Sequence, residues 1–445
     1  MRMPMRIAGI AAICSCAVFG QNFAGDWQGS LKAAGGLRLI VKIRQAAGEK
    51  WTASMFSIDQ SPDFGAGIPT DSVEVHGSTV KFGVAMVRGS YEGTLSADGN
   101  TITGTWTQGA KLPLDLNRAT PETAWKDPSP HTVRMVTVDK DVSLETLDWG
   151  GSGRALVLLA GLGNSAHIFD KFAPKLTARY HVYGITRRGS GDSSAPVTGY
   201  DADRLGDDVA AAIDQLKIER PVLAGHSIAG EELSAVAARH AGRVAGLIYL
   251  DAAYGYAFYD KAQGDLNIDS MEMQAKLEQL RPGKWKGDPK ATVDELLAML
   301  PVLERGLKER RKELDSIPPA LLSAQASAPI GGTGQAILAG QRKYTSIPVP
   351  ALAIYASPKK PPMMLGTAEQ RKAYQDFDAA RTEAQAKALE AGVPGVKVVR
   401  LANADHYVFL SNEADVLRAI EGFVDGLKTE APARQRLTAA GPLPW

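Results

Sequence analysis

The sequence predicts an α/β fold, a doubly wound and mostly parallel sheet, preceded by a small all-β domain. From about residue 136 onward, short apolar runs alternate with helical stretches, which is typical of a parallel sheet covered by helices on both faces. Residues 21–118 instead place apolar side chains at every second position, as in 37–43, which indicates strands. Residues 119–135 contain a Pro-rich stretch typical of a linker.

The N-terminal part contains at least six such alternating stretches, which predicts a small antiparallel sandwich or barrel. Asp98-Gly99 lies between two of them and is typical of a hairpin turn. Trp27, Trp51 and Trp106 could form a ligand-binding platform. Aromatic residues at strand spacing more often fill a core, and we favour that interpretation.

The most informative motif is Gly225-His226-Ser227-Ile228-Ala229, which stands between an apolar run and an alanine-rich helical stretch. A strand, sharp turn and helix in this order hold a serine on strained backbone and expose its hydroxyl. Residues two positions either side must be small, and Ala229 stands where glycine is usual. We predict that Ser227 is a nucleophile. The alternative is a Gly-rich turn with an exposed serine.

An activated serine needs a base, an orienting acid and an oxyanion site. Two histidines follow Ser227 in the sequence, His240 and His406. We expect His240 to lie at the end of the helix after the serine, where it caps the C-terminus. His406 follows a predicted strand over 396–401 and can reach across to the serine. We predict His406 as the base; the alternative is a surface histidine.

The acid is predicted from an absence. The loop after the predicted strand near 351–356 has no carboxylate before Glu369. One strand earlier, Asp251 ends an apolar run and should emerge at the same sheet edge as Ser227. Burial of that carboxylate requires a partner, which the ring N–H of His406 would supply. We predict Asp251 as the acid. A turn cap is the alternative role for Asp251, and Asp405 is a weaker candidate acid.

The oxyanion site is predicted from a second glycine-containing loop. Gly161 and Gly163 follow an apolar run and allow a close approach of the backbone to a ligand. The backbone N–H groups of Leu162 and Ile228 are the predicted donors. A tight turn without a ligand role is the alternative.

Together these motifs resemble the α/β-hydrolase superfamily over about residues 136–428. The resemblance rests on the Leu-Leu-Ala-Gly-Leu-Gly loop, the Arg-Gly segment within 182–194, the serine elbow and Asp405-His406. It implies the hydrolase sheet with a helical lid. An acid after the sixth strand is a variant known in haloalkane dehalogenases, which use an aspartate nucleophile. Serine in this position favours hydrolysis of carboxylic esters through an acyl-enzyme.

The N-terminal part is also similar to β-rich domains fused to some secreted bacterial hydrolases, through Gly25-Asp26-Trp27 and Gly104-Thr105-Trp106. Its role is left open. The predicted organisation is a signal peptide (1–20), an all-β domain (21–118), a linker (119–135), an α/β domain (136–430) and a flexible tail (431–445).

An insertion of about ninety residues, 256–345, should form a lid over the sheet edge. Thr292 and Glu295 have capping-box spacing, which predicts a helix beginning there. Apolar lid residues could line an acyl pocket or pack the lid against the body: Met271, Met273, Leu296, Leu297, Met299 and Leu300. Residues 367–391 should form a long solvent-facing helix.

The composition of the chain limits the classes of partner and cofactor that we expect. The 445 residues carry a net charge of +1 without a basic cluster, so no nucleic acid is expected. The seven histidines are scattered and no metal-binding or phosphate-binding motif is present, so we expect no metal and no cofactor. The expected partner is a small-molecule ester.

Residues 1–20 combine a basic start, a short apolar run and small residues, which predicts a signal peptide and a secreted or periplasmic protein. The run is too short to span a bilayer. Both cysteines, Cys14 and Cys16, lie within it, so the mature chain would have no disulfide. A faint likeness to a lipoprotein cleavage site would place a lipid anchor on Cys16, but the short apolar run favours plain secretion.

Several uses of the same residues remain open at this point. The triad could serve peptide or amide hydrolysis, acyl transfer to another acceptor, or cofactor-free haloperoxidase or lyase chemistry. The chain could also be a non-catalytic binding protein, although the complete Ser227, Asp251 and His406 set argues against it.

Overall fold

The computed structural model divides into two compact units, one up to Trp125 and the other from Ser129 onward. The predicted signal peptide with Cys14 and Cys16, and the predicted tail, lie outside the described residues. The structure describes residues 22–31, 37–45, 51–58, 67–125, 129–284, 287–316, 332–361 and 367–427.

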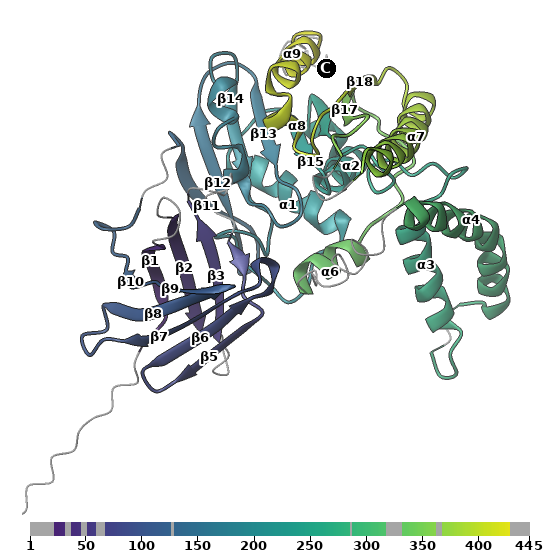
Figure 1. Cartoon of the computed structure of the whole chain (residues 1–445). Coiled ribbons are helices and arrows are strands. Elements are labelled where there is room, and N and C mark those ends of the chain that lie inside the picture. Colours follow the sequence, from purple (N-terminus) through teal and green to yellow (C-terminus); the bar gives the residue numbers. More distant parts are fainter. Residues whose placement is uncertain are drawn as a thin grey trace, which may run out of the picture. The chain divides into compact units, whose positions relative to one another are not determined.

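The first unit is one antiparallel sheet of ten strands, drawn in purple to blue in Figure 1. The strand order is β4-β3-β2-β1-β10-β8-β7-β6-β5, with β9 paired to β8. Contacts between β3 and β5 curl the sheet into a nearly closed barrel. The elements are β1 (Gly25–Leu31), β2 (Leu37–Gln45), β3 (Trp51–Ser57), β4 (Ile68–Pro69), β5 (Ser72–His76), β6 (Thr79–Val84), η1 (Ala85–Val87), β7 (Gly89–Leu95), β8 (Thr101–Gln108), β9 (Ala110–Pro113) and β10 (Leu116–Arg118).

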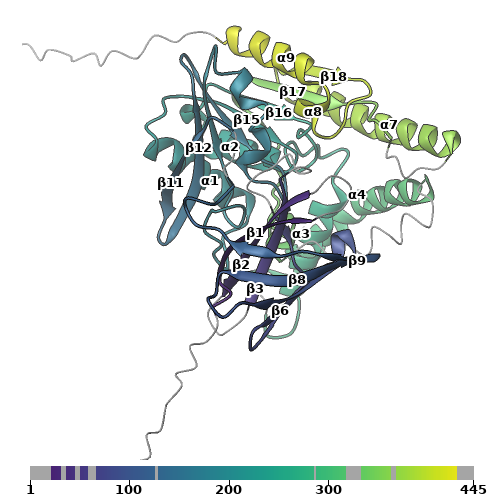
Figure 2. The same ribbon diagram turned by 60° about the vertical axis from the view of Figure 1, so that its left-hand side comes forward.

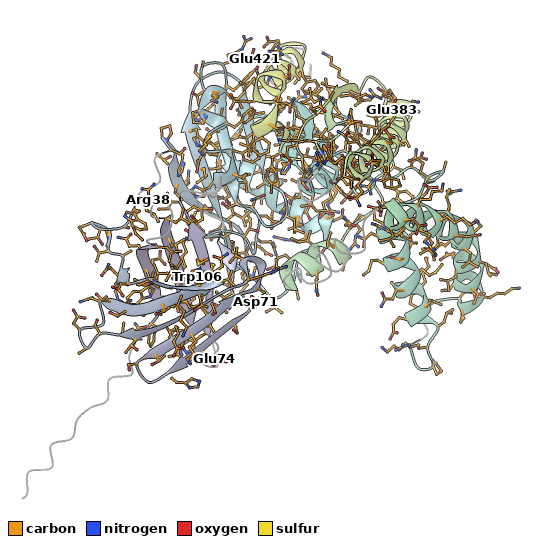
Figure 3. The ribbon with its side chains drawn as sticks, in the orientation of Figure 1. Arg38, Asp71, Glu74, Trp106, Glu383 and Glu421 are labelled. Carbon is orange, nitrogen blue, oxygen red and sulfur yellow. The ribbon has the colours of Figure 1, made fainter. Side chains whose placement is uncertain are left out.

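Two of the three predicted aromatic residues fill the core of this barrel. Trp27 and Trp106 are 0% and 1% exposed, and Trp51 packs at the core's margin. A Cβ on Gly89 would lie 2.0 Å from the Trp106 ring, so this glycine provides the space for the indole. Figure 3 labels Trp106 among these strands. The core interpretation of Trp27 and Trp106 is therefore confirmed.

The second unit contains the predicted mostly parallel sheet, of eight strands in the order β11-β12-β14-β13-β15-β16-β17-β18. Strands from β14 to β18 run parallel, whereas β12 pairs antiparallel with both β11 and β14. The strands are β11 (Thr132–Asp139), β12 (Val142–Gly150), β13 (Ala155–Leu159), β14 (His181–Ile185), β15 (Val222–His226), β16 (Gly246–Leu250), β17 (Ala351–Ala356) and β18 (Lys397–Leu401).

Helices cover both faces of this sheet because successive strand residues point to opposite sides. Tyr249 belongs to the core beneath α1, α2 and α7, and its neighbour Leu250 to the core beneath η2, η3, α8 and α9. These elements are α1 (Ala202–Gln215), α2 (Ala229–His240), α7 (Ala368–Gly392), η2 (Ala166–Phe169), η3 (Ala173–Lys175), α8 (Val408–Ser411) and α9 (Glu413–Asp425); η4 (Ala241–Arg243) follows α2.

The segment between β16 and β17 is helical, as predicted for the lid. Its helices are α3 (Leu266–Gln279), α4 (Pro289–Ser316) and α6 (Gly332–Ala339). The expected helix start at Thr292 is wrong, because α4 begins at Pro289 and the Thr292 hydroxyl donates to the carbonyl of Asp288. Asp before Pro is the stronger start signal, since proline suits the first helical position.

One expected boundary and one expected exposure differ from the structure. Strand β11 begins at Thr132, inside the stretch expected to be linker. Helix α7, a long helix in Figure 2, matches the expected bounds closely but is not solvent-facing on every side. Ala386 and Leu389 are buried, and Glu383, labelled in Figure 3, pairs with Arg400 on β18. None of the described helices has the length and apolarity needed to cross a membrane.

Candidate active site

Ser227 lies on the sharp turn between β15 and α2. Its φ is +55°, in the left-handed region that side chains rarely adopt. The residues on either side, His226 and Ile228, are buried, whereas Ser227 itself is only half-buried. The turn therefore lifts the hydroxyl clear of the strand and the helix, the geometry of a nucleophile elbow.

Small residues around this turn allow α2 to pass close to its neighbours. A Cβ on Gly225 would meet a leucine side chain at 3.0 Å, whereas one on Gly230 would lie 2.1 Å from the carbonyl oxygen of Ala252. Ala229 is accommodated without exposure. The position that needs glycine most is therefore 230, three residues after the serine, rather than 229.

The structure brings Ser227, His406 and Asp251 into one hydrogen-bonded chain. The Ser227 hydroxyl lies 2.9 Å from His406 Nε2, and His406 Nδ1 donates to Asp251 Oδ2 at 2.7 Å. The serine and the aspartate follow the ends of adjacent parallel strands, β15 and β16. The histidine follows β18 and reaches the same edge. This is the relative placement that a nucleophile, a base and an orienting acid require.

Asp251 is fully buried and its carboxylate has four polar neighbours. Oδ1 accepts hydrogen bonds from the Tyr254 hydroxyl at 2.7 Å and the Ala356 N–H at 3.0 Å. Oδ2, bonded to His406, also lies 3.4 Å from Lys359 Nζ. Burial raises the pKa of Asp251, but the hydrogen bond from His406 and the charge of Lys359 outweigh it and leave the pKa below its usual value. The carboxylate is therefore ionised.

His226 contacts the backbone of His406, the predicted base. It is 1% exposed, and its Nε2 donates to the backbone carbonyl of His406 at 3.1 Å. Burial, followed by the proximity of His406, lowers the pKa of His226 to about 3. His226 therefore stays neutral and helps to hold the loop that carries the base.

The predicted oxyanion loop lies against the serine. A Cβ on Gly161 would lie 2.8 Å from Nδ1 of His226 and 3.1 Å from the Ser227 Cβ, so glycine permits this close approach. Leu162 follows directly on this loop, and Ile228 precedes the first residue of α2. Within the described part of the chain, neither the Leu162 N–H nor the Ile228 N–H donates a backbone hydrogen bond. Both are available for an incoming oxyanion.

The lid helix nearest these donors is α6, not α3 or α4. Ile337 of α6 packs with Ile228, and Leu162 packs at the margin of the same cluster. Leu297 and Leu300 of α4 are 58% and 48% exposed. The expectation that these two leucines line a pocket or pack the lid against the body is therefore wrong. They lie on the exposed part of α4, in which Thr292 and Leu296 are the buried residues among those described.

The remaining candidates lie apart from this chain of bonds. His240 ends α2, and its Nε2 pairs with Asp207 Oδ1 at 2.7 Å. The Asp405 carboxylate accepts the backbone N–H of His406 at 2.9 Å. Asp405 thus contacts the base through its backbone, while Asp251 contacts its ring.

Sequence reasoning missed three residues around the candidate triad: Tyr254, Lys359 and His226. Lys359 lies in the loop after β17, which the sequence analysis searched for carboxylates only. A search of that loop for any charged residue would have found it. His226 occupies the variable position of the elbow motif, and nothing in its local sequence indicates a role.

A parallel sheet with a serine elbow, a histidine and an aspartate at its carboxyl edge defines the nucleophile-elbow class of α/β proteins. The chain belongs to the alpha/beta hydrolase family, whose model matches residues 156–419. The resemblance inferred from the sequence motifs, and the fold class, are therefore confirmed.

Individual relatives match shorter stretches. The chain is 38% identical over 105 residues to the AB hydrolase superfamily protein YisY of Bacillus subtilis, covering 23% of this chain and 39% of that protein. It is 35% identical over 120 residues to a non-heme haloperoxidase of Rhodococcus erythropolis, covering 26% and 43%. The chain thus spans about two fifths of the length of these curated relatives. The solved esterase of Exiguobacterium antarcticum is 19% identical, with a TM-score of 0.43 over 66% of this chain and 100% of that one.

Proposed function

We propose that the protein hydrolyses carboxylic esters of small molecules through an acyl-enzyme intermediate. The observation that carries the proposal is the unbroken chain from the Ser227 hydroxyl through His406 to the ionised Asp251. Such a chain makes a serine nucleophilic at neutral pH, because the histidine can take its proton as the oxygen attacks.

In the first step, Ser227 Oγ attacks the ester carbonyl and its proton passes to His406 Nε2. Asp251 keeps the Nδ1–H of the ring oriented toward itself and stabilises the imidazolium. The N–H groups of Leu162 and Ile228 receive the oxyanion of the tetrahedral intermediate. His406 then protonates the leaving alcohol, and the acyl group remains on Ser227.

In the second step, His406 takes a proton from water, and the resulting hydroxide equivalent attacks the acyl-enzyme. The tetrahedral intermediate collapses, Ser227 recovers its proton from His406 and the carboxylic acid leaves. Each proton removed by the base is thus returned in the same half-reaction. Esters are favoured over amides because an ester oxygen leaves more readily than an amide nitrogen and depends less on protonation by His406.

The proposal is tested with a fluorophosphonate probe, which labels an activated serine, on the whole chain and on Ser227→Ala. We expect labelling of the wild type and none of the variant. Ser234, which is buried in α2 and bonded to Tyr249, supplies the matched control, since Ser234→Ala should label like the wild type. A folded wild type that does not label would refute the proposal and favour a non-catalytic binding protein.

A substrate panel separates the remaining uses of the triad. Nitrophenyl esters of increasing acyl length, aminopeptidase substrates and a halogenation assay should be run with the wild type and Ser227→Ala. We expect Ser227-dependent turnover of esters. Ser227-dependent turnover of amides with no ester turnover would replace the ester proposal by amide hydrolysis.

We also propose that the chain is exported, on the strength of the basic and apolar pattern in residues 1–20. N-terminal sequencing of the protein from a producing cell tests this. A mature protein that begins near residue 21 would support it, whereas retention of Met1 would overturn it.

A further inference from the structure

A second group of titratable side chains lies in the same unit but belongs to other elements than the candidate triad. His131 precedes β11, and His167 and Asp170 lie in η2 and at its end. One potential ligand atom from each of the three comes within 4.8 Å of the others. Their side chains are 5%, 7% and 9% exposed. The two histidines are 36 positions apart in the sequence, so no local motif indicated this cluster.

The Asp170 carboxylate joins the two imidazoles. His131 Nδ1 lies 2.9 Å from Oδ1 of Asp170, and His167 Nδ1 lies 2.9 Å from Oδ2. Trp149 Nε1 donates to the same Oδ1 at 3.1 Å. The three potential donors to a metal ion are thus two imidazole nitrogens and one carboxylate, held in place by an indole N–H.

His167 carries the decisive geometry, because both of its ring nitrogens face a carboxylate. Nδ1 faces Asp170, and Nε2 lies 3.3 Å from Oε1 of Glu145, which is 2% exposed. A neutral imidazole has only one N–H and can satisfy only one of these carboxylates. A metal ion on Nδ1 would let His167 face both carboxylates, with its single N–H directed to Glu145.

The side chains around His167 favour a metal ion on its Nδ1. Metal-bound histidines almost always donate their other ring N–H to a carboxylate, a backbone carbonyl or water, which fixes the tautomer. Glu145 is in that position on His167, and Glu145 Oε2 is itself held by the Thr186 hydroxyl at 2.7 Å. A cation bound by the three ligand atoms would offset the desolvation of the buried carboxylates of Asp170 and Glu145.

We propose that His131, His167 and Asp170 bind a divalent transition-metal ion, zinc in the first instance. Imidazole nitrogen and carboxylate oxygen are ordinary zinc ligands, with bonds of about 2.0–2.2 Å. Tetrahedral zinc holds such ligand atoms about 3.4 Å apart, so the two 2.9 Å contacts need to open by about half an ångström. Water would complete the coordination.

The proposed ion has a structural role that is independent of the hydrolytic proposal. It would tie the segment leading into β11 to η2, which directly follows the loop that carries Leu162. The Ala166 N–H donates to Thr186 Oγ1 at 3.0 Å, so the residue beside His167 already shares the hydrogen-bond network of Glu145. Metal binding would thus stabilise the start of the α/β unit and the far end of the oxyanion loop.

The test is zinc content of the full chain by mass spectrometry after chelation, reloading with zinc at micromolar free concentration and desalting. We expect about one zinc ion per chain in the wild type, and less than about a tenth of that in His131→Ala, His167→Ala and Asp170→Asn. The matched control is His181→Ala, because His181 also pairs with a single aspartate, Asp148, but in a half-exposed site. It should retain the full zinc content.

Glu145→Gln provides a graded test that does not remove a ligand. Loss of such an outer partner typically weakens metal affinity by about 10–100-fold. Zinc should also raise the melting temperature of the wild type and not that of Asp170→Asn. Ser227→Ala should bind zinc like the wild type, which separates failure of this proposal from failure of the hydrolytic one.

Two outcomes would overturn the proposal. A folded wild type that retains less than about a tenth of an equivalent of zinc, and equally little cobalt, iron or manganese, would mean that the cluster is only a set of hydrogen-bonded side chains. Full zinc content in all three ligand variants would mean that the metal binds elsewhere on the chain.

Discussion

The ammonium group of Lys359 lies 3.4 Å from Oδ2 of Asp251, the oxygen that also accepts the hydrogen bond from His406. The lysine comes from the loop after β17 and also contacts the Tyr254 hydroxyl at 3.1 Å. A cation therefore stands beside the predicted triad acid, in the loop that the sequence analysis searched for a carboxylate. It favours the charged form of Asp251.

Replacement of Lys359 should shift the acid limb of the pH profile of kcat/KM to higher pH. In Lys359→Met the pKa of Asp251 should rise, because a favourable charge is lost while burial remains. Loss of the positive charge would favour the protonated form of the coupled Asp251–His406 pair, so the acid limb of kcat/KM for a nitrophenyl ester should shift to higher pH. Lys372→Met on α7, which breaks an exposed pair with Asp376, should leave the profile unchanged. An unshifted profile in Lys359→Met would mean that Lys359 only packs against Tyr254.

The acid assignment predicts a sharp difference between two aspartates. Asp251→Asn should lower kcat by about 10⁴, because the ring of His406 loses the partner that fixes its tautomer. Asp405→Asn should change kcat only mildly, since Asp405 contacts a backbone N–H of the histidine. Steady-state kinetics on the best ester substrate provide the measurement. The reverse order of the two effects would reassign the acid to Asp405.

Two glycine-to-alanine changes, one beside the elbow and one in α9, should have opposite effects on the free energy of unfolding. Gly230→Ala should destabilise the fold by about 1–3 kcal/mol or more, because the new methyl group would lie 2.1 Å from the carbonyl oxygen of Ala252. Gly422→Ala should stabilise it by about 0.5–1 kcal/mol, since Gly422 lies inside α9 with open space around it. Urea unfolding of both variants tests this, and equal effects would contradict the packing described for α2.

Replacement of the buried Glu231 should stabilise the fold at high pH. Glu231 is 0% exposed, and within the described residues neither carboxyl oxygen has a hydrogen-bond partner. Burial, followed by the charge of Glu232, raises the pKa of Glu231 well above 4.5. Above about pH 4.5 the unfolded chain releases this proton while the folded chain keeps it, so the contribution of Glu231 to stability falls as pH rises.

Glu231→Gln should therefore be more stable than the wild type by about 1 kcal/mol or more at pH 8, with the difference shrinking toward pH 4. Glu383→Gln on α7, at a half-buried position, is the control and should show a small effect of opposite sign, because hydrogen bonding to Arg400 lowers the pKa of Glu383. Urea midpoints across this pH range provide the measurement. A difference that does not depend on pH would mean that Glu231 is ionised in the fold.

The local sequence was sufficient to predict most strands and helices and to identify the family. Alternating and helical periodicities depend on which side of a strand or helix is buried, so they predicted the β unit and the parallel sheet. The elbow was recognised because its strained serine requires small neighbours within a few positions. The order of serine, aspartate and histidine along the chain then led to Ser227, Asp251 and His406, and the structure places these three side chains in contact.

What depends on the approach of distant segments could not be read from the sequence. The glycine requirement at 230 arises from Ala252, on a different element. Lys359 reaches Asp251 from 108 positions away along the chain, and His131 meets Asp170 across 39 positions. The periodicity of apolar residues shows which side of a strand or helix is buried, but it does not show which segment covers that side. The electrostatics of the acid and the clustering of His131, His167 and Asp170 were therefore decided only by tertiary packing.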